Sequence, residues 1–250
     1  MLRLWPEKQT LFLLPEHSWC AVGKSLRTVQ AGEGTRLQQL NSMAQQLLSE
    51  CAIKRGVQPV LDVVIGGNGC RLLMLPWQTR LRKGDEQRRY AEVCFESEGV
   101  SADEWIVQAS YRHFGMPGLA LAVRRDVMAM LDELATTRSS RLRSVLPLGG
   151  LAYWRHQPSR HGNTILILDE GKCLTAMAYA NGRLDFVEIQ PVGAHRILAL
   201  TQLVRRCQMA ARVVVQLSFW TAESMELDET IFAAAWPEAS LKKLPAGEWQ

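Results

Sequence analysis

The sequence of 250 residues predicts a fold of the α/β class, with helices and strands mixed in an α+β arrangement and divided between two lobes. Roughly the first thirty residues and the stretch Asn163–Ile189 each alternate short β-prone runs with turn residues, which is typical of antiparallel meanders. Apolar residues at helical spacing follow each of them. Because 47% of the residues are hydrophobic, the chain can bury a core in each lobe.

The first lobe is predicted to begin with short strands that Pro6, Pro15 and Gly23 separate. These strands cover Leu2–Trp5, Thr10–Leu14, Trp19–Val22 and Leu26–Val29. Apolar residues then recur at i, i+3 and i+4 across Arg36–Lys54, which predicts an amphipathic helix after the meander.

A glycine-rich segment, Gly66–Gly69, separates two predicted strands, Val60–Ile65 and Cys70–Leu75. We interpret it as the turn of a hairpin joining these strands. A phosphate-binding loop is the alternative, but neither Gly-Lys-Ser/Thr nor a helix follows the glycines.

A small subdomain is expected as an insertion covering approximately residues 72–124. It would contain a helix at Gly84–Glu98 and two strands at Trp105–Tyr111 and Leu119–Val123. The rest of the first lobe is predicted as helix Arg125–Thr136, strand Leu142–Pro147 and a helix near Leu148–Trp154.

The polar, basic segment Arg155–Gly162 is predicted to link the lobes, so that residues 1–154 form the first lobe and residues 163–250 the second. His156 and His161 lie in this segment without a neighbouring acid or cysteine. A solvated linker is therefore favoured over a metal site.

The second lobe opens with the clearest pattern in the sequence. Its three apolar runs are separated by the loop Asp169–Cys173 and by Asn181-Gly182, a dipeptide typical of a type I′ hairpin turn. A helix is predicted at Ala194–Met209 and a strand at Val213–Leu217. The inward positions expected for this helix are Ile197, Leu198, Leu200, Leu203 and Val204. The remaining residues, including the runs Met225–Leu227 and Ile231–Trp236, are few, so we expect a reduced second lobe.

The order of elements in this part of the chain resembles the second phosphate loop of the actin-like (RNase H-like) ATPase fold. That order is an apolar strand, Asp-x-Gly, a threonine, a hairpin and a helix that begins after a glycine. Asp169, Gly171 and Thr175 occupy the matching positions. The resemblance implies that they would be the cofactor-binding residues if ATP and Mg²⁺ bind. The inserted subdomain is similar to that of PilM-type pilus-assembly proteins and of the cytoplasmic domain of the type II secretion L protein. The absence of a membrane-spanning stretch favours the free-standing pilus type.

Two departures from that pattern argue against nucleotide chemistry. The first phosphate loop of the family is normally Asp-x-Gly, but this chain has Leu14–Ser18, in which Pro15 lacks a backbone donor and Glu16 is not followed by glycine. Ser218-Phe219-Trp220 stands where the family has a Gly-Gly adenosine motif. We therefore expect no cofactor and a non-catalytic pseudo-ATPase, with an active nucleotide-binding ATPase as the alternative. Asp169 would then cap a turn or bond to Thr175, and Lys172 would be an exposed turn residue.

The resemblance implies a cytoplasmic scaffold at the inner face of the inner membrane. It would dock the tail of an inner-membrane assembly protein in a type IV pilus or type II secretion-like assembly, and could couple it to a motor ATPase. Trp77, Trp105, Phe114 and Met116 lie beside strand ends and Gly/Pro turns, so they are the expected partner-binding residues. Sealing of the subdomain's own core is the alternative role for these side chains.

Composition bounds the remaining function classes. No run of 18 apolar residues and no leader pattern is present, so we expect no membrane span and no export. The six cysteines have no metal-ligand spacing and are expected to be reduced. The net charge of +4 permits an anionic partner, but the basic groups are spread among acids without an RNA-binding signature, which disfavours a nucleic-acid-binding module. No catalytic triad or carboxylate pair can be assembled from the spacing.

Overall fold

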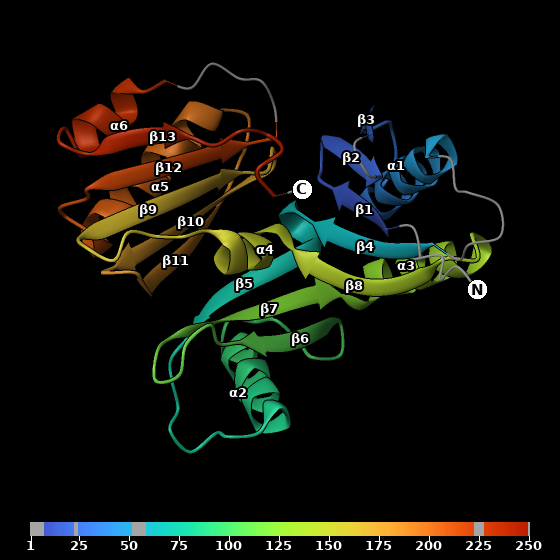
Figure 1. Ribbon diagram of the computed structural model, residues 1–250, viewed down its shortest axis with the longest axis horizontal. Helices are drawn as coiled ribbons and strands as arrows, with labels where there is room; N and C mark the ends of the chain where they lie inside the picture. Colours follow the sequence, from blue (N-terminus) through green and yellow to red (C-terminus); the bar gives the residue numbers. More distant parts are fainter. Residues whose placement is uncertain (1–7, 23–24, 52–58, 223–227, 250) are drawn as a thin grey trace, which may run out of the picture.

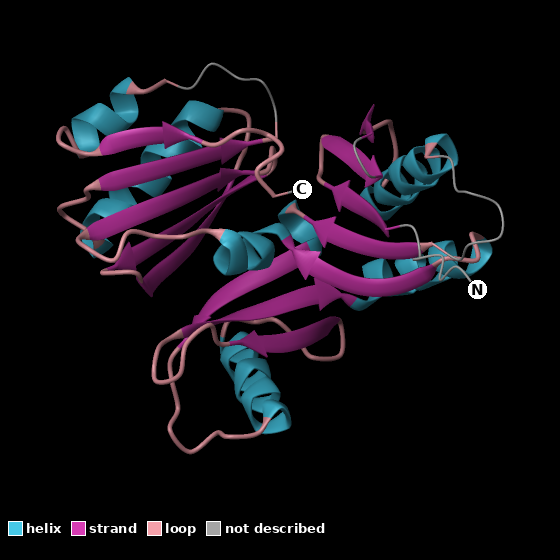
Figure 2. Ribbon diagram, in the orientation of Figure 1, coloured by secondary structure: helices cyan, strands magenta, loops and turns pink. Residues whose placement is uncertain are grey.

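The computed structural model describes residues 8–22, 25–51, 59–222 and 228–249. Three sheets form its frame: a five-stranded mixed sheet in each lobe and a three-stranded antiparallel sheet in a small subdomain (Figure 1). Figure 2 shows the helices packed outside these sheets, apart from α4, which lies between the two lobes. The mixed α/β class predicted from the sequence is confirmed.

The first sheet joins a meander to two parallel strands, in the order β3–β2–β1–β4–β8. The meander is antiparallel throughout, whereas β4 runs parallel to both β1 and β8. The strands are β1 (Lys8–Leu13), β2 (His17–Val22), β3 (Ser25–Gln30), β4 (Val60–Ile65) and β8 (Arg141–Pro147). Helices α1 (Arg36–Glu50) and α3 (Arg125–Thr137) pack on this sheet. The predicted strand Leu2–Trp5 lies outside the described residues.

The hairpin predicted at Gly66–Gly69 is wrong. Strand β4 is already paired on both edges, so the strand that follows the glycines, β5 (Cys70–Leu75), joins the subdomain sheet and pairs with β7 (Gly118–Arg124). A short 3₁₀ turn at Gly67–Gly69 carries the chain from one sheet to the other. The apolar runs predicted the bounds of both strands correctly, but not the strands with which they pair.

The subdomain contains β5, β7, β6 (Trp105–Ser110) and helix α2 (Gly84–Ser97). Its separate core is small, and Trp105 is part of it. The buried members are Leu75, Ala91, Phe95, Trp105, Val107, Ala120 and Ala122.

The second sheet has the order β11–β10–β9–β12–β13. Its strands are β9 (Asn163–Asp169), β10 (Cys173–Ala180), β11 (Arg183–Pro191), β12 (Gln216–Thr221) and β13 (Ser240–Lys243). The predicted meander is present, and Asn181 and Gly182 both have positive φ, 51° and 79°, as a type I′ turn requires. Helices α5 (Arg196–Ala210) and α6 (Thr230–Ala235) complete the lobe.

Two expectations for the second lobe need correction, and a third concerns residues that the structure does not describe. The strand predicted at Val213–Leu217 is β12, which starts at Gln216, so Ser218-Phe219-Trp220 lies within the strand and not in a loop after it. The pairing of β12 with β9 sets where the strand begins, because the first residue pair is Gln216 with Thr164. Ile197 and Leu198 are 64% and 55% exposed and do not face the core. The run Met225–Leu227 lies outside the described residues.

One apolar cluster joins the lobes to each other. It surrounds α4 (Leu148–Arg155) and includes Trp19 from the first lobe and Trp220 from the second, whose ring centroids lie 6.3 Å apart. A Cβ on Gly149 would lie 2.2 Å from Leu72 Cδ1, so α4 packs closely here and a larger residue would push Leu72 aside. None of the helices in the described ranges is both long and apolar enough to cross a bilayer.

Candidate functional site

The β1–β2 loop and the β9–β10 loop meet between the lobes. Lys172 Nζ lies 2.6 Å from Glu16 Oε1, which joins the predicted turn lysine to the acid of the first loop. Gly171 has φ +86°, and a Cβ there would lie 3.1 Å from Glu16 Oε2. The close approach of the two loops therefore depends on a glycine at position 171.

Glu170 is the most buried acid of these loops, at 3% exposed. Its Oε2 accepts a hydrogen bond from the backbone N–H of Gly67 at 2.6 Å, and its Oε1 accepts one from Thr175 Oγ1 at 2.9 Å. Burial raises the pKa of Glu170 to about 7, although both hydrogen bonds favour the ionised form. This carboxyl thus links the second lobe to the β4–β5 turn of the first.

The backbone of that turn is shaped for the contact. A Cβ on Gly66 would lie 2.2 Å from Leu14 Cδ2 and 2.6 Å from Glu170 Oε2, so both side chains would have to shift to admit a larger residue. Gly67 has φ +63°, and a Cβ there would meet Pro15 at 2.4 Å. The glycines that could be mistaken for a phosphate loop are favoured by packing.

Asp169 is held by the start of α5. The N–H of Gly171 donates to Asp169 Oδ1 at 3.1 Å, and Arg196 Nε donates to Asp169 Oδ2 at 2.8 Å. Asp169 is 4% exposed, so this arginine supplies the charge that a buried carboxylate needs.

The structure brings Asp169, Gly171 and Thr175 together in one loop and strand end, as their spacing predicted. The prediction that Asp169 caps its turn is confirmed. The alternative bond to Thr175 is wrong, because Thr175 Oγ1 donates to Glu170 instead. Sequence reasoning missed Glu170 and Arg196, whose partners come from other segments of the chain.

Three solved structures share this architecture over nearly the whole chain. A chain of a PilM–PilN type IV pilus biogenesis complex is 13% identical, with a TM-score of 0.67, and the match covers 97% of this chain and 89% of that one. A protein of unknown function with an actin-like ATPase fold from Bacteroides thetaiotaomicron is 10% identical, with a TM-score of 0.61 and coverages of 95% and 90%. The chain has the actin-like ATPase fold.

A third actin-like match is the cytoplasmic domain of EpsL, an inner membrane component of the type II secretion system of Vibrio cholerae. It is 13% identical with a TM-score of 0.57, covering 97% of this chain and 92% of the domain. No protein-family model and no curated protein matches the sequence. At these identities the likeness concerns the fold, and the function has to be argued from the site.

The actin-like fold implies ATP and Mg²⁺ between the two meander loops, but the described residues there do not fit a triphosphate. The N–H groups of Gly67 and Gly171 already donate to the carboxylates of Glu170 and Asp169. Pro15 has no N–H to offer. Glu16 and Asp169 form ion pairs with Lys172 and Arg196, so the chain's own carboxylates already engage two of the cations that a phosphate would need.

From the sequence, Phe219 and Trp220 were expected to stand in place of the Gly-Gly adenosine motif and to close the nucleotide pocket. The structure does not support that use of these two residues. Both are residues of strand β12 with partners of their own: the ring centroid of Phe219 lies 5.9 Å from that of Phe232, and Trp220 Nε1 donates to Ala246 O at 3.3 Å. The meander loops disfavour a triphosphate, and these two aromatic residues do not bear on it.

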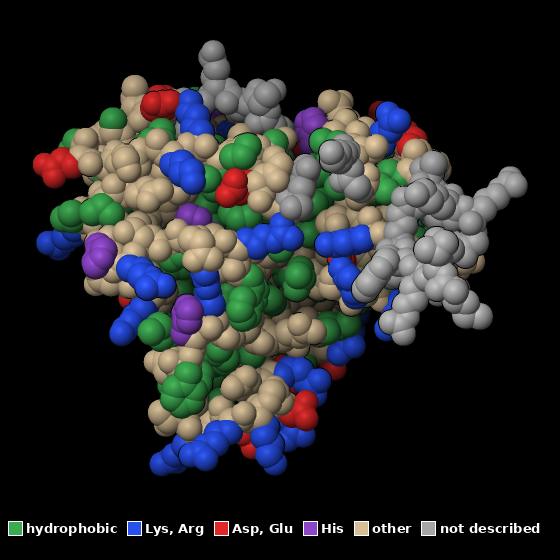
Figure 3. Space-filling view, in the orientation of Figure 1, with side chains coloured by type: hydrophobic (Ala, Val, Ile, Leu, Met, Phe, Trp, Pro, Cys, Tyr) green, Lys and Arg blue, Asp and Glu red, His purple; other side chains and the backbone are tan. Residues whose placement is uncertain are grey.

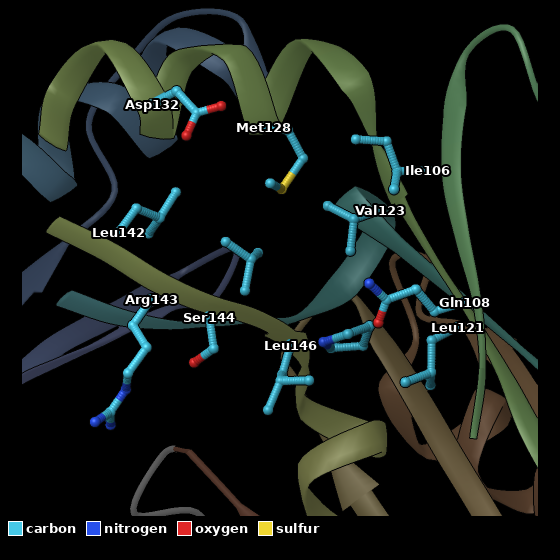
Figure 4. Close-up of a pocket in the computed structure, with 12 residues that line it drawn as sticks. Ile106, Gln108, Leu121, Val123, Met128, Asp132, Leu142, Arg143, Ser144 and Leu146 are labelled. Carbon is cyan, nitrogen blue, oxygen red and sulfur yellow. The ribbon is translucent and has the colours of Figure 1, made fainter. Parts of the chain in front are cut away.

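Apart from these loops, a groove of about 470 Å³ lies between β8, α3 and the β6–β7 hairpin (Figure 4). Its lining is mixed: Met128 from α3, Ile106 from β6, Val123 from β7 and Leu142 from β8 form apolar walls, and Gln108, Asp132, Arg143 and Ser144 add polar groups. β8 is the last strand of its sheet, and among the described strands none pairs with its outer edge. The groove therefore combines apolar walls with free backbone hydrogen-bonding groups.

The four residues expected to bind a partner fall into two places. Trp105 is 8% exposed in the subdomain core, with the guanidinium of Arg71 5.4 Å from the centre of its ring. Trp77, Phe114 and Met116 belong to the two loops at the far end of the subdomain. The groove lining in the described part of the chain includes none of the four.

His156 is not solvated as the linker interpretation expected. Its ring lies 5.7 Å from that of Tyr179 in the second lobe. Burial, with the nearby cations Lys242 and Arg112, lowers the pKa of His156 to about 4, so the side chain is neutral at physiological pH. Among the described residues, no group of three His, Cys, Asp or Glu side chains is placed to hold a metal ion.

Proposed function

We propose that the chain is a non-catalytic actin-like scaffold that binds an extended tail of an inner-membrane assembly protein, on the cytoplasmic side, in a pilus- or secretion-type system. The observation that carries the proposal is the apolar groove along the unpaired edge of β8. The likeness in fold to a chain of the PilM–PilN complex and to the cytoplasmic domain of EpsL supports the choice of partner.

The groove suits a peptide in an extended conformation. A peptide added beside β8 would form backbone hydrogen bonds with its free edge, which supply affinity whatever the peptide's sequence. Alternate side chains of such a strand point to one face, where Met128, Leu142 and Val123 would cover them. Burial of those side chains would supply the selectivity for an apolar tail.

The inter-lobe loops support a role without nucleotide turnover. Their backbone donors and acids are engaged with each other through Glu170 and Asp169, and the lobes share one apolar cluster. Opening the space for a nucleotide would break these contacts. We therefore assign the binding role to the groove and not to the position between the lobes.

A crosslinking experiment tests the proposal. A photoreactive amino acid at Val145, in the groove, should capture one membrane protein through its cytoplasmic tail, and mass spectrometry of the crosslinked peptide should identify that segment. Met128→Arg places a charged side chain into the groove and should abolish capture. Ala129→Arg, the neighbouring exposed position on the same helix, is the matched control and should leave capture unchanged. Equal capture by both variants would refute tail binding in the groove.

A further inference from the structure

The far end of the subdomain exposes an aromatic side chain that packing does not require. We call the two loops there, residues 76–83 and 111–117, the tip. Phe114 is 89% exposed, and its ring centroid lies 4.8 Å from that of Trp77, which in turn lies 5.2 Å from that of Tyr111. The three rings thus run outward from the half-buried Tyr111 to the exposed Phe114.

The tip is fixed to the subdomain and does not depend on Phe114 for its shape. Tyr111 donates its hydroxyl hydrogen bond to Pro76 O at 3.3 Å, and Gln78 bonds to Tyr90 of α2 at 3.1 Å. Gly115, with φ +76°, makes the turn that directs the preceding phenylalanine outward. The backbone therefore presents an apolar side chain to solvent, at the extreme of the subdomain.

The same tip carries basic side chains. Arg80, Arg82 and Lys83 are exposed in the loop before α2. The nearby acids have partners other than these three side chains: Arg88 lies 3.7 Å from both Asp85 and Glu92, and Glu86 accepts hydrogen bonds from the backbone N–H groups of Arg82 and Lys83. In the described part of the chain, no acid pairs with the three loop cations. Figure 3 shows Lys and Arg side chains next to an exposed hydrophobic patch at this end of the molecule.

We infer that the tip is a membrane-contact surface for anionic lipid, with Phe114 entering the headgroup region and the loop cations facing the lipid charges. Aromatic side chains favour the membrane interface, and an anionic leaflet attracts clustered lysines and arginines. A single weak membrane signal gives only marginal binding, whereas apolar insertion and attraction to anionic lipid reinforce each other.

A single-stranded nucleic acid would be the other polyanion to consider. It is bound by aromatic faces lying open in a basic groove. Here Phe114 protrudes from a loop and is followed by Met116 and Pro117, so the tip presents apolar bulk and not a stacking platform. The geometry favours lipid.

Vesicle co-sedimentation tests the inference on the intact chain. Wild type should sediment with vesicles of phosphatidylcholine mixed with phosphatidylglycerol and stay in solution with pure phosphatidylcholine. The triple change Arg80→Gln, Arg82→Gln and Lys83→Gln should weaken binding more than tenfold, since each cation near an anionic surface is worth about fivefold. Matched changes at the exposed Arg160, Arg205 and Arg212 should have much less effect.

The apolar contribution is separated by single substitutions. Phe114→Ala should weaken vesicle binding about tenfold, and Phe114→Trp should retain it. Met209→Ala removes a side chain that is 87% exposed on α5 and should have no effect. Melting temperatures should stay at the wild-type value, because Phe114 contributes little to the core.

Three results would overturn the inference: no binding to anionic vesicles at low salt, binding that neither the triple change nor Phe114→Ala reduces, or Phe114-dependent binding of a single-stranded oligonucleotide without vesicle binding. The inference stands apart from tail binding. Met128→Arg should leave vesicle binding intact, so a failure of the tip and a failure of the groove can be told apart.

Discussion

Replacing Glu170 with glutamine should stabilise the protein at and above neutral pH. Burial raises the pKa of Glu170 from its ordinary value of 4.5 to about 7. Because each tenfold difference in proton affinity is worth about 1.4 kcal/mol, the ionised carboxylate costs the fold about 3 kcal/mol above that pH. Glutamine is neutral at every pH. Its Oε1 can accept from the Gly67 N–H, and its amide can donate to the Thr175 hydroxyl, so both contacts of Glu170 have a replacement.

The sign follows from proton binding. Between pH 4.5 and about 7 the folded state holds a proton on Glu170 that the unfolded state has released. The stability of the wild type should therefore fall as pH rises through this window, and the cost is complete above it. The pKa of His156 is lowered to about 4, which makes stability fall in the acid direction, but this group is present in both proteins and cancels in their difference.

Urea denaturation of wild type and Glu170→Gln at several pH values measures the effect. The stability of the variant relative to wild type should grow by about 2.5 kcal/mol between about pH 5 and about pH 8. Glu98→Gln, at an exposed glutamate, is the control and should show no such trend. A difference that is flat with pH would refute the burial of an ionisable carboxyl between the lobes.

Three further outcomes are expected. Gly66→Ala should destabilise the protein by about 1–3 kcal/mol, because its Cβ would lie 2.6 Å from Glu170 Oε2; a wild-type urea midpoint would contradict the close approach. Burial acts to raise the pKa of Asp62, but hydrogen bonds led by Arg143 outweigh it and hold the pKa below the ordinary value. The advantage of wild type over Asp62→Asn should therefore be lost as pH falls through the acidic range, and an advantage independent of pH would count against the ion pair. Calorimetry with ATP and Mg²⁺ should show no saturable heat at micromolar concentrations, where about −8 kcal/mol would be at stake; tight binding that Asp169→Ala abolishes would instead favour an active ATPase.

The sequence predicted best where the signal is local. The meander of the second lobe follows from Asn181-Gly182, whose turn type fixes the hairpin without help from the rest of the chain. The start of α1 at Arg36 is fixed by the adjacent capping box of Thr35 and Gln38, and the sequence placed it correctly.

Predictions failed where a distant partner decides. Val213 and Val215 favour a strand by propensity, yet both are exposed and the strand starts after them, because β9 sets the register of β12. Likewise Val60–Ile65 and Cys70–Leu75 are strands as predicted, but which sheet each joins depends on β1, β8 and β7. Ile197 and Leu198 are apolar residues of α5, but the buried residues of this helix are Ala199, Leu200, Leu203, Val204 and Cys207, so neither belongs to its buried face.

The role of Glu170 could not be predicted from its neighbours in the sequence either, because its partner is distant in the chain. In an Asp-x-Gly pattern the middle residue counts as a spacer, and its role here comes from Gly67, which lies 103 positions earlier in the chain. That contact also changes what the pattern means. Close packing favours glycine at position 66, positive φ favours it at 67 and 171, and the donors at positions 67 and 171 are used by the chain's own carboxylates. Loop packing and backbone conformation can account for these glycines without a ligand. Their presence in a sequence therefore does not by itself argue for a bound phosphate.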